Sequence, residues 1–289
     1  MMTDQVPYLK MNGLGNDFVV VDARASGVRF SSDQVRRIAD RDSGIGCDQM
    51  IVLEPAPGAD ADVFMRIYNH DGGEVDACGN AARCVAALVA KETGRDAVSV
   101  ATNAGSLPSI VNGDSVSVDM GVPRFGWEDI PLAEEFADTT GIELQIGPID
   151  APVLHTPSVV NVGNPHAVFW VKDDPETYDL HLFGPLLENH PIFPERANIS
   201  VAQVIDVTRI KVRVWERGVG LTRACGTAAC AVAVAAARKG LTGREVTIEL
   251  PGGPLALNWR DDDHIIMTGP WAEDGEGVLP EDLLVEPAA

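Results

Sequence analysis

The chain has 289 residues, of which 45% are apolar and 22% charged, as expected for a globular protein of about two domains. Its formal net charge of −21 leaves no basic surface for nucleic acid or an anionic membrane, and we interpret the acidity as a source of solubility. Five cysteines without a signal-peptide pattern predict free thiols in the reducing cytoplasm. The longest apolar run, about residues 228–237, is too short to span a bilayer.

The first half alternates between strand and helix signals. Residues 18–21 are β-rich, and 31–40 form a capped surface helix with an apolar stripe. Residues 54–62 are rich in Pro and Asp and predict a loop. Residues 65–69 alternate like a strand and lead into a cysteine loop. A small-residue helix over 81–90 follows it.

That cysteine loop occurs twice in the chain. Residues 77–82 read Ala-Cys-Gly-Asn-Ala-Ala, and 224–229 read Ala-Cys-Gly-Thr-Ala-Ala, so Cys78 and Cys225 stand 147 residues apart. Cysteine followed by glycine, a small polar residue and alanines indicates a helix N-terminus. The sequence therefore predicts two thiols, each at its own helix start.

The same period continues along both halves. Gly15-Asn16 corresponds to Gly163-Asn164, each before a β-rich run; 65–69 corresponds to 212–216, and 119–121 to 266–268. We place the crossover near 126–140. This gives one domain of residues 1–125 plus 272–289, with Cys78, and a second of 126–271, with Cys225.

The helices after the cysteines predict the architecture. Residues 228–237 are apolar all round, and 81–90 are similar apart from Arg83. A helix without a polar face must be buried on every side. We predict an α/β (α+β) fold of two similar domains related by a pseudo-twofold repeat, each a curved mixed β-sheet or barrel around a central helix.

Two thiols at helix starts form a chemical device. A helix N-terminus stabilises a thiolate and lowers its pKa by roughly one unit. If the two thiols face each other, they share one proton, since the first charge raises the pKa of the second. Such a pair removes a proton from one face of a carbon and delivers another to the opposite face, while helix N–H groups bind the adjacent carboxylate. Packing of two small apolar side chains is the alternative that we disfavour, because the motif is repeated.

A zinc site is disfavoured by the spacing within the pairs Cys78/Cys84 and Cys225/Cys230. Cys47, Cys84 and Cys230 are expected to be buried.

The chain resembles the diaminopimelate epimerases, within the cofactor-independent racemase and epimerase group. The resemblance covers nearly the whole length, and its motifs are Gly13-Leu14-Gly15-Asn16-Asp17-Phe18, Gly44-Ile45-Gly46-Cys47-Asp48-Gln49, Asn69-His70-Asp71-Gly72, Cys78-Gly79-Asn80, Gly163-Asn164-Pro165-His166, Phe193-Pro194-Glu195-Arg196-Ala197-Asn198, Glu216-Arg217-Gly218 and Ala224-Cys225-Gly226-Thr227.

The resemblance implies an enzyme with its active site between two similar domains. It implies reversible conversion of LL-2,6-diaminopimelate to the meso isomer in the synthesis of L-lysine and peptidoglycan precursors, without pyridoxal phosphate, another cofactor or a metal. The expected partner is a small amino-acid substrate, with no nucleic acid and no membrane. A homodimer is expected but not fixed by the sequence.

Site residues follow from the same resemblance. Cys78 and Cys225 are the implied base and acid. The implied substrate-binding residues are Asn16, Gln49, Asn69, Gly79, Asn80, Asn164, Asn198, Glu216, Arg217, Gly226 and Thr227. His166 and Glu216 are the implied tuners of the thiol pKa values. Arg217 suits a carboxylate and Glu216 an ammonium group.

Three other functions are weighed. A proline or hydroxyproline racemase, or another isomerase of the group, is the main alternative; Arg217, Asn164 and Asn198 disfavour it, because a cyclic imino acid has no distal amino-acid group for them to hold. A binding module that has lost its chemistry is disfavoured by the retention of both cysteines. A pyridoxal phosphate enzyme is set aside, since none of the five lysines has the setting of a Schiff base.

Overall fold

The computed structural model describes residues 5–285, which divide into two compact units. Unit 1 comprises the chain up to Val118 and from Gly269 onward, and unit 2 comprises Asp119–Thr268. No helix within residues 5–285 has the length and hydropathy needed to span a bilayer.

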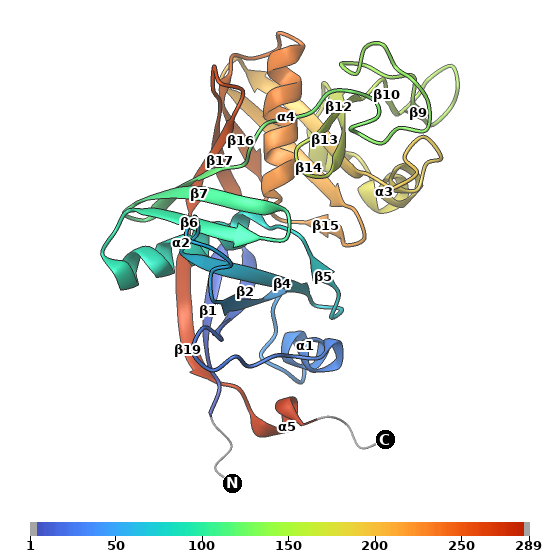
Figure 1. The fold of residues 1–289 in the computed structure, drawn as a ribbon. Helices are drawn as coiled ribbons and strands as arrows, with labels where there is room; N and C mark the ends of the chain where they lie inside the picture. Colours follow the sequence, from blue (N-terminus) through green and yellow to red (C-terminus); the bar gives the residue numbers. More distant parts are fainter. Residues whose placement is uncertain (1–4, 286–289) are drawn as a thin grey trace. The chain divides into compact units, whose positions relative to one another are not determined.

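Unit 1 is built on a mixed sheet (Figure 1). Its elements are β1 (Pro7–Gly13), β2 (Asn16–Asp22), α1 (Ser32–Ala39), β3 (Gln49–Glu54), β4 (Val63–Asn69), β5 (Glu74–Val75), α2 (Gly79–Thr93), β6 (Ala97–Thr102), β7 (Gly105–Asn112), β8 (Ser115–Asp119), β19 (Ala272–Val278) and α5 (Glu281–Leu284). The parallel pairs are β2 with β3 and β4 with β6. The antiparallel pairs are β1 with β2 and with β19, β3 with β4, β4 with β5, β6 with β7, and β7 with β8.

Unit 2 follows the same order of pairing. Its elements are β9 (Gln145–Ile146), β10 (Leu154–His155), β11 (Ser158–Asn161), β12 (Pro165–Val171), the 3₁₀ turn η1 (Pro175–Thr177), α3 (Leu180–Glu188), β13 (Asn198–Asp206), β14 (Arg209–Glu216), β15 (Gly220–Thr222), α4 (Gly226–Arg238), β16 (Glu245–Leu250), β17 (Gly253–Trp259) and β18 (Ile265–Pro270). Here β12 and β14 pair in parallel with β13 and β16, as β2 and β4 do with β3 and β6.

In each unit the sheet packs on a helix without an exposed polar face. In α4, Ala228 through Ala236 are all buried, and the helix packs on β11, β12, β13, β16 and β17. In α2, the corresponding packing is on β1, β4, β6 and β7, and even Arg83 is fully buried, donating to the carbonyl of Pro270 at 3.1 Å. Small alanine side chains allow strands to approach these helices closely. The mixed sheet packed on a buried helix in each unit confirms the predicted fold class.

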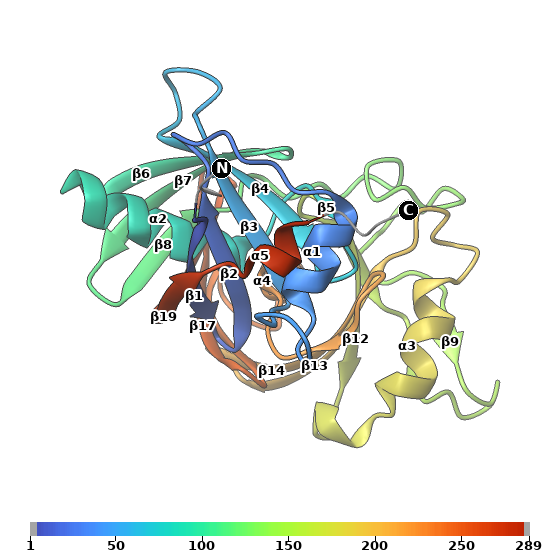
Figure 2. The same cartoon turned by 90° about the horizontal axis from the view of Figure 1, so that it is seen from below.

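A second helix packs elsewhere on each sheet. The predicted helix at 31–40 is confirmed as α1: Ser31 and Gln34 form a capping box, and Val35, Ile38 and Ala39 are buried. Figure 2 shows α5 beside α1 in unit 1. In unit 2, α3 joins a core with Phe169, Ile199 and Val201. The loop predicted at 54–62 lies between β3 and β4.

A tight turn fixes the chain between β4 and β5, and it yields a stability prediction. Gly72 has a φ of +83°, and a Cβ there would lie 2.4 Å from the carbonyl oxygen of Ser32, at the start of α1. Gly72→Ala therefore adds steric overlap to backbone strain, and we expect a loss of about 2–4 kcal/mol in the free energy of unfolding. Gly113→Ala is the control: its φ is +58° with no atom within 4 Å, so only about 1 kcal/mol is expected. Urea unfolding measures both, and equal losses would contradict the packing argument.

Candidate active site

Cys78 in unit 1 is the N-cap residue of α2. Its side chain is half-buried, and its Sγ accepts a hydrogen bond from the backbone N–H of Ala81 at 3.5 Å. The Oδ1 atom of Asn16 lies 3.9 Å from this sulfur and accepts from Nδ2 of Asn80 at 3.2 Å. The structure thus brings three of the predicted site residues together at the start of α2, where Gly79 is the first helical residue.

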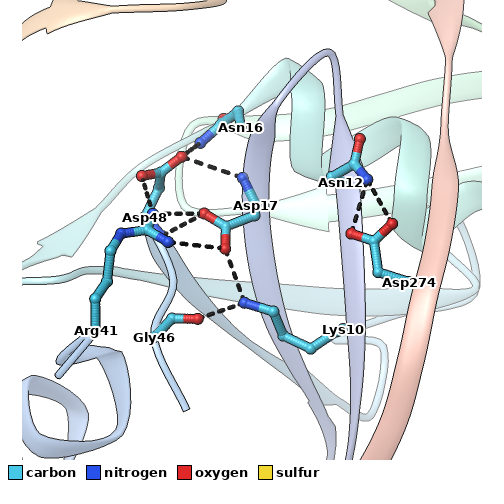
Figure 3. Close-up of polar contacts among 8 residues, drawn as sticks. All are labelled: Lys10, Asn12, Asn16, Asp17, Arg41, Gly46, Asp48 and Asp274. Carbon is cyan, nitrogen blue, oxygen red and sulfur yellow. Dashed lines mark hydrogen bonds and ion pairs between the residues drawn. The ribbon is translucent and has the colours of Figure 1, made fainter. Parts of the chain in front are cut away.

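An ionic network holds the amide of Asn16 (Figure 3). Asn16 Nδ2 donates to Oδ2 of Asp48 at 2.9 Å, and Arg41 bridges Asp48 and Asp17 with two contacts of 2.7 Å. Because a carboxylate only accepts, Asp48 requires the amide nitrogen to face it, which leaves the amide oxygen facing Cys78 and Asn80. Burial opposes ionisation of Asp17, but hydrogen bonds from Arg41 and Lys10 outweigh it and lower the pKa to about 2.

Gln49 and Asn69 form a second group in unit 1. They lie opposite each other on β3 and β4, and Gln49 Nε2 donates to Asn69 Oδ1 at 2.9 Å. The Oε1 atom of Gln49 is buried without a hydrogen-bond partner among the described residues. A buried acceptor without a partner is costly, so a bound donor group would lower its free energy.

In unit 2, Cys225 is the N-cap residue of α4, and Gly226 begins the helix. Its Sγ lies 3.5 Å from the hydroxyl of Thr227, which accepts from Nδ2 of Asn164 at 3.5 Å. Asn164 Oδ1 is in turn 2.7 Å from Nε2 of His166 on β12. The hydroxyl of Thr227, which has one donor and two acceptor sites, therefore links Asn164 to the sulfur of Cys225.

The surroundings of Cys225 oppose ionisation. Burial raises the pKa of its thiol well above the ordinary value, and the nearby carboxylate of Glu216 raises it further. The hydroxyl of Thr227 and the N–H of Ala228 act in the opposite direction but are outweighed. The N–H of Ala228 at the helix start thus lowers the pKa, as predicted, but burial outweighs this effect, and Cys225 is a protonated thiol at neutral pH.

His166 and Glu216 are linked to Cys225 in different ways. His166 is fully buried, and burial together with the charge of Arg217 lowers its pKa to about 3, so its ring is neutral near pH 7. Its link to the cysteine runs through Asn164 and Thr227. Glu216 instead acts on the thiol by its charge.

Asn198 joins two backbone segments next to these groups. It is buried; its Nδ2 donates to the carbonyl of Pro165 and its Oδ1 accepts from the N–H of Arg217, both at 3.0 Å. The guanidinium of Arg217 donates to the carbonyl of Glu195 at 3.0 Å. An arginine has five N–H donors, so this contact leaves most of its donor capacity for an anion.

Sequence reasoning does not single out Asp48 as a site residue. The only signal is its place beside Gln49 in the Gly44–Gln49 motif, and that motif does not reveal that its carboxylate reaches Asn16 on another strand.

The site residues predicted from the sequence fall into two sets, one in each unit. Unit 1 holds Asn16, Gln49, Asn69, Cys78, Gly79 and Asn80; unit 2 holds Asn164, His166, Asn198, Glu216, Arg217, Cys225, Gly226 and Thr227.

A solved structure of an epimerase shares this fold. A hydroxyproline epimerase from Agrobacterium vitis matches with a TM-score of 0.68 at 14% identity, over 96% of this chain and 93% of that one. The mixed sheet and the buried helix of each unit define the class as a two-unit α/β protein with the fold of that epimerase.

Sequence comparison identifies the family within that class. The family model described as "Diaminopimelate epimerase" matches residues 8–126 and 158–272. A diaminopimelate epimerase from Brucella anthropi is 52% identical over 97% of this chain and 99% of its own length. Another, from Afipia carboxidovorans, is 56% identical over 96% of each chain. The chain belongs to the diaminopimelate epimerase family.

The effect of Glu216 on Cys225 yields a prediction. Glu216→Gln removes a negative charge that raises the thiol pKa, so the pH midpoint for alkylation of Cys225 should fall by about one unit or less, since burial is unchanged. Iodoacetamide labelling at several pH values, read by peptide mass spectrometry, measures the midpoint. Glu249→Gln is the control, because Glu249 is an exposed partner of Arg209. A midpoint unmoved in Glu216→Gln would contradict the assignment.

Proposed function

We propose that this chain is an amino-acid epimerase that interconverts LL-2,6-diaminopimelate and meso-diaminopimelate without a cofactor. The single observation that carries the proposal is a cysteine at the start of the buried helix in each unit, Cys78 before α2 and Cys225 before α4. Relatives named diaminopimelate epimerase, 52% and 56% identical over nearly the whole chain, support this substrate. The reaction would supply L-lysine and peptidoglycan precursors.

The proposed chemistry is proton exchange at the α-carbon. Cys78, as the thiolate, removes the α-proton: the C–H bond breaks and an S–H bond forms. Cys225, as the thiol, gives its proton to the opposite face, which inverts the centre and leaves a thiolate on Cys225. The raised pKa of Cys225 supports its starting role as the acid. The reverse reaction exchanges the two roles, and the scheme requires both sulfurs to reach opposite faces of one carbon.

The helix starts are proposed to bind the reacting amino acid's carboxylate. The first intrahelical bonds run from Ala82 to the carbonyl of Cys78 and from Ala229 to that of Cys225. The N–H groups of Gly79, Asn80, Gly226 and Thr227 precede those bonds and lie at the positive ends of the helix dipoles. These groups stabilise the charge that develops on the carboxylate when the α-proton leaves.

The distal amino-acid group is proposed to bind the polar side chains around these helix starts. Arg217 would bind its carboxylate and Glu216 its ammonium group. The amides would complete the pocket, namely Asn16, Gln49, Asn69, Asn164 and Asn198. The buried, unpartnered Oε1 of Gln49 supports a bound donor.

The proposal also covers the location of the enzyme and its partners. We expect a cytoplasmic protein that acts on a small molecule, and the net charge of −21 disfavours nucleic acid as a partner. A homodimer and the catalytic role of the cysteines stay predictions.

Proton NMR tests the proposed substrate. The reduced protein, without cofactor, should convert LL-diaminopimelate to the meso isomer and leave L-proline unchanged. Turnover of proline alone would favour the proline or hydroxyproline racemase alternative, which the fold shared with a hydroxyproline epimerase supports. Turnover of neither by folded, reduced protein would favour a binding module.

Cysteine variants in the same assay test the two-base scheme. Cys78→Ala and Cys225→Ala each remove one proton carrier, so each should lower kcat by at least about a thousandfold. Cys84→Ala on α2 and Cys230→Ala on α4 are matched controls, because both are buried thiols on the same helices and neither is a proposed proton carrier. Full activity in either of the first two variants would contradict the scheme.

A further inference from the structure

Glu188 is a buried carboxylate outside the set of residues assigned above. It is the last residue of α3, and its side chain is only 7% exposed. A carboxylate at a helix C-terminus faces the negative end of the helix dipole, so this position does not stabilise the helix. A buried charge in such a place requires partners that compensate it.

Its partners come from two other segments of unit 2. Oε2 accepts from the indole Nε1 of Trp215 at 2.7 Å, and Oε1 accepts from the backbone N–H of Gly218 at 2.8 Å. Arg196, which is half exposed, donates to Oε1 at 3.2 Å. All three partners are donors, so only a side chain with two terminal oxygens that both accept hydrogen bonds satisfies them.

The geometry of α3 brings these groups together. Gly184 lies one turn before Glu188 on the same face of the helix. A Cβ at Gly184 would lie 2.4 Å from Cδ2 of Trp215, so the indole packs directly on the helix backbone. This packing brings the indole N–H to Glu188. The end of β14 is thereby docked on α3.

The residues held this way flank Arg217. Trp215 lies two positions before it, Gly218 follows it, and Arg196 adjoins Glu195, whose carbonyl accepts from the Arg217 guanidinium. The backbone of Glu216 is fixed separately by its pairing with Gly220 between β14 and β15. The N–H of Arg217 keeps its bond to Asn198, but loss of the Glu188 contacts releases Gly218 on its other side, so Arg217 is displaced more than Glu216.

We propose that Glu188 is a positioning residue that sets the place of Arg217 for binding the distal carboxylate of the substrate. This inference rests on the proposed function, because Arg217 affects turnover only if it binds the substrate. Glu188 itself touches no reacting atom. Its effect belongs to substrate binding, and the chemical step at the cysteines is affected less.

Glu188→Gln tests this role with little change in shape. Glutamine presents one acceptor and one amide donor, so whichever way it turns, an N–H group faces another N–H group. We expect KM for LL-diaminopimelate to rise about tenfold, while kcat falls by less than about threefold. Glu176→Gln is the matched control, since Glu176 is an exposed partner of Arg213, and both constants should be unchanged. The proposal would be overturned if KM in Glu188→Gln were unchanged, or if kcat fell about tenfold while KM stayed the same.

A double variant separates positioning from packing. Trp215→Phe removes the indole donor, so the glutamine in Glu188→Gln can turn its amide N–H toward the ring and keep its oxygen for Gly218. KM of the double variant should then lie within about threefold of that of Trp215→Phe alone. Effects on KM that simply multiply would show that no donor conflict exists and would overturn the proposal.

Hydrogen exchange provides a readout that needs no substrate. The peptide covering residues 215–219 should exchange at least about tenfold faster in Glu188→Gln than in the wild type, and Glu176→Gln should match the wild type. Unchanged exchange overturns the inference about Glu188. Absence of epimerisation by the wild-type protein would instead overturn the proposed function, while the exchange data still decide whether Glu188 holds this turn.

Discussion

The burial of two helices that lack a polar face is the constraint on which this structure depends. In α2 every residue from Gly79 to Ala87 is buried, as is every residue from Ala228 to Ala236 in α4, so each unit must pack strands against its helix. Enclosure also limits access of water to the first N–H groups of each helix, which need another partner. In both units the N-cap residue, which directly precedes these N–H groups, is a cysteine. The packing that stabilises the fold thus places a thiol and a set of backbone donors at one end of each enclosed helix.

The two thiols share a motif but not an environment. Cys78 is half-buried and faces an amide oxygen whose direction is set by Asp48. Cys225 is buried beside the carboxylate of Glu216, and its pKa is raised accordingly. A two-base enzyme needs one proton donor and one proton acceptor at the start of each turnover. Burial and the carboxylate of Glu216 favour the protonated form of Cys225, which supplies the proton donor of the proposed scheme.

Local pattern predicted much of the fold. The capping box of α1, the loop at 54–62 and the apolar helix around 228–237 are visible in the residues themselves, and the family resemblance supplied the candidate site residues. Long-range contacts could not be predicted. The sequence does not show how deeply Cys225 is buried, and this burial raises the pKa of its thiol. Nor does it show that Asp48 contacts Asn16, or that Glu188 contacts Trp215, 27 positions away.

Isotope distribution in the first turnovers tests the central claim most directly. The wild-type protein is incubated with LL-diaminopimelate in D₂O, and the reaction is stopped before about one tenth of the substrate is consumed. Two thiols that act on opposite faces predict deuterium at the inverted α-carbon of every meso product molecule, while the remaining LL substrate keeps its proton. A single shuttling base predicts product that retains substrate hydrogen, and that result would contradict the account.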